Sequence, residues 1–104
     1  MTKTERNRMD REFSLKIRSR GKCQWPGCNN TAVNSQLQTA HIYSRRYLKL
    51  RWDEDNALCL CAKHHMEAHH SPLVFRDVVY KLLGPEKCQR LLDKRNDLSK
   101  EALK

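Results

Sequence analysis

The sequence predicts a small α+β fold, in which two short strands joined by a loop are surrounded by helices. Three observations lead to this prediction. Residues 36–42 and 57–61 have the length and composition of strands, apolar residues recur at helical spacing before and after them, and the chain of 104 residues suffices for one domain. We therefore expect a single domain over residues 1–104, divided into a basic helix (1–22), a central core (23–70), a helical pair (71–97) and a tail (98–104).

The first predicted element is an amphipathic helix over residues 3–20. This stretch contains no Gly or Pro, Met9, Phe13 and Ile17 recur between charges at helical spacing, and Gly21 is a helix-ending residue. The polar side is basic, which is typical either of a helix that follows a phosphate backbone or of a solvated helix face. Its basic residues are Lys3, Arg6, Arg8, Arg11, Lys16, Arg18, Arg20 and Lys22.

The central core is predicted to contain a tight turn, two strands and a helix. Pro26-Gly27 forces a turn between Cys23 and Cys28. A strand is expected over residues 36–42, a basic connecting loop over 43–52, a turn over 53–56, a second strand over 57–61 and a helix over 62–70.

Two further helices are predicted after Ser71-Pro72, separated by Gly84-Pro85. We expect both to pack against the N-terminal helix and to bury much of the core. The residues expected to face inward are Leu73, Val74, Val78, Leu82 and Leu83 in the first helix and Cys88, Leu91 and Leu92 in the second, which ends near Asp97.

The charge of the chain favours a polyanionic partner. Lys and Arg number 21 against 12 acidic residues, for a net charge of +9 and a pI near 9.6, which suits DNA, RNA or an anionic membrane surface. No apolar run approaches the roughly 20 residues needed to span a bilayer, and the N-terminus lacks the apolar segment of a secretion signal. We therefore expect a cytoplasmic protein without a membrane anchor.

Five cysteines in a reducing compartment are better explained as metal ligands or buried thiols than as disulfides. Two short chelating pairs supply the four ligands of a structural zinc ion, namely Cys23 with Cys28 and Cys61 with His64, and zinc would stabilise a small core. Cys59 lies on the same side of its strand as Cys61 and is the alternative ligand. We favour Cys61 because its spacing from His64 closes a compact loop, and we interpret Cys88 as a core thiol.

Three sequence segments then occur in a characteristic order. These are Thr39-Ala40-His41-Ile42, Asp55-Asn56-Ala57-Leu58 and Cys61-Ala62-Lys63-His64-His65, with His69 one turn later. With the cysteine turn, this series resembles the HNH (ββα-metal, or His-Me finger) endonucleases, and most closely small phage and prophage HNH proteins, over about residues 23–72. The resemblance implies a ββα-metal unit with a zinc knuckle, and a metal-dependent DNA endonuclease that nicks or cuts both strands with little sequence specificity.

The resemblance also implies roles for individual residues. His41 would be the general base, because an imidazole titrates near neutral pH, and Asn56 would fix its orientation. His65 and His69 lie four residues apart on one helix face and would hold a catalytic divalent ion such as Mg²⁺, Mn²⁺ or Ni²⁺. Many family members place a further ligand directly before the catalytic His, where this chain has Ala40, so water or substrate phosphate would complete the coordination.

Several alternatives remain open. Arg45, Arg46, Lys49 and Arg51 are expected to bind DNA phosphates or else to be solvated loop charges. Taken alone, His41 is more typical of an ordinary half-buried strand residue, and Asn56 is more typical of turn chemistry. Besides DNA, a second copy of the chain or phage packaging and recombination proteins are the expected partners. The alternative functions are a zinc-stabilised nucleic-acid-binding module without catalysis, and a structural adaptor.

Overall fold

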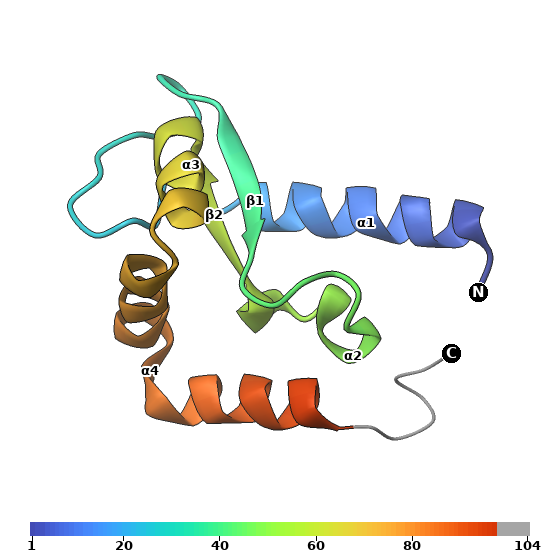
Figure 1. Cartoon of the computed structure of the whole chain (residues 1–104). Helices are drawn as coiled ribbons and strands as arrows, with labels where there is room; N and C mark the ends of the chain where they lie inside the picture. The colour runs from blue at the N-terminus through green and yellow to red at the C-terminus, as the bar shows by residue number, and fades with distance from the viewer. Residues whose placement is uncertain (98–104) are drawn as a thin grey trace.

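A computed structural model describes residues 1–97 and has the predicted α+β composition (Figure 1). The expected tail, residues 98–104, lies outside the described residues. A two-stranded antiparallel sheet stands at the centre, and helices pack around it. In chain order the elements are α1 (Lys3–Arg18), β1 (Leu37–His41), α2 (Leu48–Arg51), the 3-10 helix η1 (Glu54–Asn56), β2 (Ala57–Cys61), α3 (Ala62–His70) and α4 (Pro72–Asn96).

The hairpin carries the core of the molecule. Its register pairs Leu37 with Cys61 at one end and His41 with Ala57 at the other, so both strands lie within one residue of their predicted bounds. Every residue of β2 is buried, although β1 pairs with only one of its edges. The other edge is covered by Gln24, whose backbone N–H donates to the Cys59 carbonyl and whose Oε1 accepts from the Cys59 N–H, both at 2.8 Å.

Helix α1 packs against one face of the hairpin. Thr2 caps its N-terminus by accepting the Glu5 N–H at 3.1 Å, and Phe13 and Ile17 are buried in the same hydrophobic cluster as the strands. The hydroxyls of Ser14 and Thr39 share a hydrogen bond of 2.9 Å. Adjacent strand residues point to opposite faces, so this contact assigns the odd-numbered side of β1 to α1.

Helix α3 covers the other face of the hairpin and has the predicted bounds. Its His65 contacts Gln38, an even-numbered residue of β1. Helix α4 follows after Ser71 and breaks at Gly84, whose φ of 84° and ψ of 168° are not helical and suit only glycine. It is therefore two helices joined by a bend, as Gly84-Pro85 predicted.

The packing of α4 differs from the prediction. Its main contacts are with α2, α3 and η1 rather than with α1, because α1 and α3 already occupy the two faces of the hairpin. The residues that face inward also differ in part. Val78, Val79 and Leu91 are buried, whereas Leu73, Val74 and Leu82 are exposed.

The segment predicted as a connecting loop contains the short helix α2, which the sequence analysis missed. Leu50 of this helix is fully buried. The bent second half of α4 is tied to the turn after α2, where Asp53 accepts hydrogen bonds from Arg90 at 3.0 Å and Lys94 at 2.7 Å. Burial raises the pKa of Asp53, but these two cations outweigh that effect and lower it to about 2.

Across residues 1–97, none of the helices combines the length and the apolar character that crossing a membrane would require.

Candidate functional site

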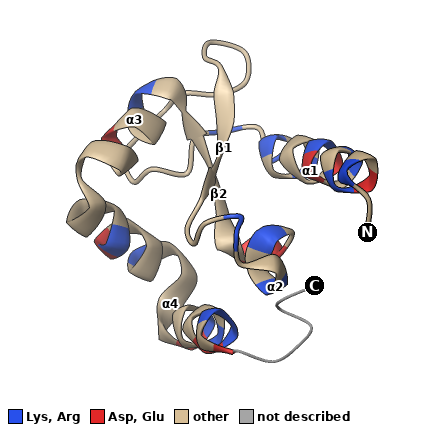
Figure 2. Cartoon of the chain, turned by 45° about the vertical axis from the view of Figure 1, so that its right-hand side comes forward, with Lys and Arg blue, Asp and Glu red and all other residues tan. Residues whose placement is uncertain are grey.

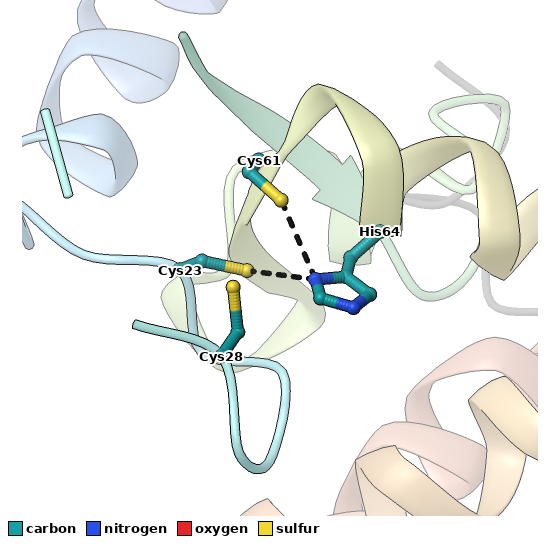
Figure 3. A group of neighbouring side chains, drawn as sticks. All are labelled: Cys23, Cys28, Cys61 and His64. Carbon is teal, nitrogen blue, oxygen red and sulfur yellow. Dashed lines mark hydrogen bonds between the residues drawn. The ribbon is translucent and has the colours of Figure 1, made fainter. Parts of the chain in front are cut away.

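Four side chains converge in the geometry of a metal-binding site: Cys23, Cys28, Cys61 and His64 (Figure 3). Their ligand atoms all lie within 4.8 Å of one another, and Nδ1 of His64 is 3.6 Å from Sγ of Cys23 and 3.4 Å from Sγ of Cys61. Tetrahedral zinc with bonds of about 2.3 Å to sulfur and about 2.0 Å to nitrogen separates S and N by about 3.5 Å. The four side chains are therefore close enough to hold a metal ion such as zinc.

Two separate parts of the chain bring these ligands together. Cys61 ends β2 and His64 lies in the first turn of α3, so the strand-to-helix junction supplies one pair. The other pair comes from the cysteine turn, in which Gly27 has a φ of 82° and the Cys28 N–H donates to the Trp25 carbonyl at 3.0 Å. Gln24 anchors that turn to the edge of β2, which sets Cys23 beside Cys61.

The surroundings orient the imidazole and favour a bound cation. The ring of Trp25 stacks on that of His64, with centroids 4.9 Å apart and planes 5° from parallel. Burial raises the pKa of the Cys23 thiol to about 11. Burial also raises the pKa of Cys61, but hydrogen bonds from Asn30 and the His64 backbone outweigh it and lower the value to about 6. A cation between the two sulfurs would allow both to ionise.

The two remaining cysteines lie outside this group. Cys59 is fully buried within β2, opposite Thr39 of β1, and its sulfur is not among the four ligand atoms that lie close together. Cys88 is partly buried against the core. The geometry thus favours Cys61 over Cys59 as the ligand, and it agrees with the interpretation of Cys88 as a core thiol.

His41 lies at the end of β1, between α1 and α2. Its ring centroid is 5.6 Å from that of Phe13, and its Nε2 is 3.3 Å from the backbone carbonyl of Arg51. A carbonyl oxygen only accepts, so Nε2 carries the proton and Nδ1 keeps its lone pair. Burial lowers the pKa of His41 below its usual value of 6.5, which leaves the ring neutral at physiological pH.

Asn56 ties together the segment that follows His41. Its side chain is fully buried, its Oδ1 accepts the Tyr43 N–H at 2.9 Å, and its Nδ2 donates to the carbonyls of Tyr43 and Leu50 at 3.0 Å each. Three hydrogen bonds from one amide thus close the loop between β1 and α2. Asn56 binds the carbonyl of Leu50, and the carbonyl of the next residue, Arg51, is the one that accepts from His41.

We expect Asn56→Ala to lower the free energy of unfolding by about 2–4 kcal/mol, because the N–H and the carbonyl of Tyr43 lose their partner and the Leu50 carbonyl keeps only its bond from the Asp53 N–H. Urea denaturation at saturating zinc measures this change. The matched control is Asn29→Ala at an exposed position, where the loss should stay below about 0.5 kcal/mol. Equal stability of the two variants would contradict the structural role of Asn56.

His65 and His69 lie side by side on α3. Their ring centroids are 5.0 Å apart, and His65 Nδ1 is 2.6 Å from Oε1 of Gln38. Burial lowers the pKa of His65, and the charges that His69 and His41 would carry lower it further. Within residues 1–97, however, no third His, Cys, Asp or Glu joins this pair in a second metal-binding group, and Ala40 is buried on the same side of β1 as Gln38.

The basic residues predicted to bind DNA fall into two kinds, those paired with an acidic residue in a half-buried position and those that are exposed. Arg51 donates to Asp10 of α1 through Nε at 2.9 Å and Nη2 at 2.6 Å, and Lys49 pairs with Asp97. Arg45 and Arg46 are exposed, although Arg45 also approaches Asp10 at 3.4 Å. Lys49 and Arg51 therefore help to hold the loop, whereas Arg45 and Arg46 extend from it.

Three residues near these sites were missed by the sequence analysis: Gln24, Gln38 and Asp10. Asp10 accepts from Trp52 Nε1 at 2.9 Å as well as from Arg51, and so it joins α1 to the segment that holds His41. Gln38 could have been noticed from the sequence, because it is a polar residue inside a predicted strand. No local pattern marks Gln24 or Asp10, because their partners lie 35 or more residues away.

Comparison of the chain with family models, curated proteins and solved structures yields no match in any of the three.

Proposed function

We propose that this protein is a metal-dependent DNA endonuclease of the HNH type, which hydrolyses phosphodiester bonds. The observation that carries the proposal is the environment of His41. Its Nε2–H is held by the Arg51 carbonyl, its Nδ1 is left as a free base, and its pKa is lowered. A neutral imidazole with a fixed tautomer is what proton abstraction from water requires.

The chemistry assigned to His41 is acceptance of a proton at Nδ1 from a water molecule that attacks phosphorus. A new P–O bond forms, the bond from phosphorus to the 3′-oxygen breaks, and the 3′-oxygen takes up a proton from solvent water, to which His41 later releases its own. His65 and His69 are the residues that would hold a divalent ion, which would supply positive charge to the phosphate and the leaving oxygen. They would share a phosphate with His41 only past the end of β1, where a charge on His41 acts on His65. Asn56 and the Asp10–Arg51 pair keep His41 in place.

The charge distribution supports a nucleic-acid substrate. The net charge is +9, and Figure 2 shows ribbon coloured for Lys and Arg on the helices around the hairpin, α1 and α2 among them. Arg45 and Arg46 follow His41 closely in the chain and are exposed. We assign phosphate binding to these two residues, since guanidinium groups bind phosphate oxygens in a bidentate manner.

The group formed by Cys23, Cys28, Cys61 and His64 has a structural role in this proposal. Zinc is the ion that fits three thiolates and one imidazole in a closed tetrahedral set. Such a site leaves no open position for substrate, so it would join the cysteine turn to β2 and α3 without taking part in hydrolysis.

A second function is favoured by one observation. The cysteine-rich group is the only metal-binding cluster found among the described residues, which suits a zinc-stabilised nucleic-acid-binding module without catalysis. Incubation of supercoiled plasmid with the zinc-loaded protein and Mg²⁺, Mn²⁺ or Ni²⁺ separates the two functions. The nuclease gives relaxed or linear plasmid that EDTA prevents, whereas retention of plasmid without cleavage in any of the three ions supports the binding module.

The rate of cleavage should fall as the pH is lowered through the pKa of His41, because protonation of Nδ1 removes the base. Burial lowers the pKa of His41 below 6.5. In a plot of cleavage rate against pH, the midpoint of the fall on the acidic side should therefore also lie below 6.5. Single-turnover cleavage from pH 5 to 8 measures it. The ion concentration is varied to show that the fall does not reflect ion binding, and a midpoint above 6.5 would argue against His41 as the base.

A further inference from the structure

Gln38 of β1 contacts α3 through its side-chain amide. Oε1 of Gln38 lies 2.6 Å from Nδ1 of His65, and both residues are half-buried. An amide oxygen can only accept a hydrogen bond, so the hydrogen between these atoms belongs to the imidazole. A neutral imidazole that carries its proton on Nδ1 has its lone pair on Nε2, which is the atom then free to bind a cation.

We propose that Gln38 is a positioning residue, which holds His65 in the tautomer with Nδ1 protonated and thereby presents Nε2 as a metal ligand. The inference rests on the proposed function, because it describes how α3 would hold the catalytic ion. Histidines that ligate metals commonly donate their second ring N–H to a carbonyl or carboxylate, and loss of that partner typically lowers metal affinity about 10–100-fold. Gln38 would supply this partner.

The place of Gln38 in the fold supports this assignment. Gln38 and Ala40 point to the side of the hairpin that α3 covers, whereas Thr39 and His41 point toward α1. Because Ala40 offers no ligand atom, more of the ion's affinity must come from His65 and His69. The orientation of His65 therefore matters more here than it would in a site with three protein ligands.

The neutral amide of Gln38 also suits a metal-binding imidazole. Only the uncharged imidazole can offer Nε2 to a metal ion. Gln38 fixes the tautomer of that ring through Oε1 without adding a charge. A carboxylate at this position would make the same hydrogen bond, but it would also stabilise the imidazolium, which cannot bind a metal ion.

The test compares Gln38→Leu, which removes the acceptor, with Gln38→Glu, which keeps one. Gln36→Leu is the matched control, since Gln36 is exposed and lies just before β1. In the zinc-loaded full chain, long-range ¹H–¹⁵N NMR reports the His65 tautomer, with His65→Gln used for assignment. Titration with Ni²⁺ by calorimetry reports the affinity of the second ion.

We expect the wild type and Gln36→Leu to show protonated Nδ1, and Gln38→Leu to show mixed tautomers and roughly 10–100-fold weaker Ni²⁺ binding. Gln38→Glu should keep the tautomer at pH 8 and most of the affinity. An unchanged tautomer and affinity in Gln38→Leu, or absence of a second Ni²⁺ site in the wild type, would overturn the inference. A wild type that binds Ni²⁺ as expected but leaves plasmid intact would refute the nuclease proposal and leave the role of Gln38 standing.

Discussion

Replacing His41 with alanine is expected to lower the rate of plasmid cleavage by about 10²–10⁴-fold, the usual contribution of a general base. Nε2 of His41 donates to the Arg51 carbonyl, which leaves Nδ1 as the atom that accepts the proton, and alanine has no atom to take that role. The variant should still retain DNA and still contain one zinc ion. His41 contacts the ring of Phe13, so some loss of stability is expected, and cleavage is therefore compared at a temperature where the variant is folded.

The matched control for this variant is His70→Ala. His70 is exposed on α3, so this change also removes one imidazole but spares His41, His65 and His69. Its cleavage rate should stay within about twofold of the wild type. Loss of zinc from His41→Ala would show that the role of His41 is structural, and equal activity of the two variants would remove His41 as the base.

Removal of zinc is expected to unfold the protein. Structural zinc contributes about 10–16 kcal/mol in small zinc-finger peptides, whereas a whole domain is stable by about 5–15 kcal/mol. The cysteine turn is joined to β2 through Gln24, and Cys61 and Cys23 are both in the main core cluster. Circular dichroism during titration with a strong chelator should therefore show loss of helical signal together with release of zinc.

Substitution of one zinc-ligand candidate at a time tests which side chains bind the ion. Cys28→Ser should weaken zinc binding by roughly 10²–10³-fold, about a quarter of the binding free energy. Cys28 is only half-buried, so lost packing contributes little to this result. Cys88→Ser is the matched control and should keep full zinc affinity. Release of zinc by Cys59→Ala, with zinc retained by Cys61→Ala, would refute the ligand assignment made here.

The cysteine-rich group and the His65–His69 pair differ in how many protein ligands the fold brings together. The four ligand atoms of the cysteine-rich group all lie within 4.8 Å of one another, which matches a closed structural site. His65 and His69 form only a pair among the described residues, so an ion there would depend on water and substrate phosphate for its other ligands. Ion binding at α3 is therefore expected to tighten when DNA is present, whereas zinc binding should be independent of DNA.

Local sequence was sufficient to predict the elements whose signals are short-range. Gly21 and Gly84-Pro85 mark helix ends, and β2 and α3 have the predicted bounds. The four zinc-ligand candidates were also predicted, because two chelating pairs are visible as spacings along the chain. The spacing from His64 already favoured Cys61 over Cys59, and the structure agrees by placing Cys61 in the group.

The packing of α4, the short helix α2 and the surroundings of the histidines depend on contacts between distant segments. Gln38 meets His65, Arg51 meets Asp10 and the Arg51 carbonyl meets His41 only after the hairpin has placed α1 and α3 on its opposite faces. Sequence periodicity reports which side of an element is apolar, but it does not report which partner covers that side. The candidate chemical groups were thus readable from the chain, whereas their tautomers, their hydrogen-bond partners and the helices that hold them follow from tertiary packing.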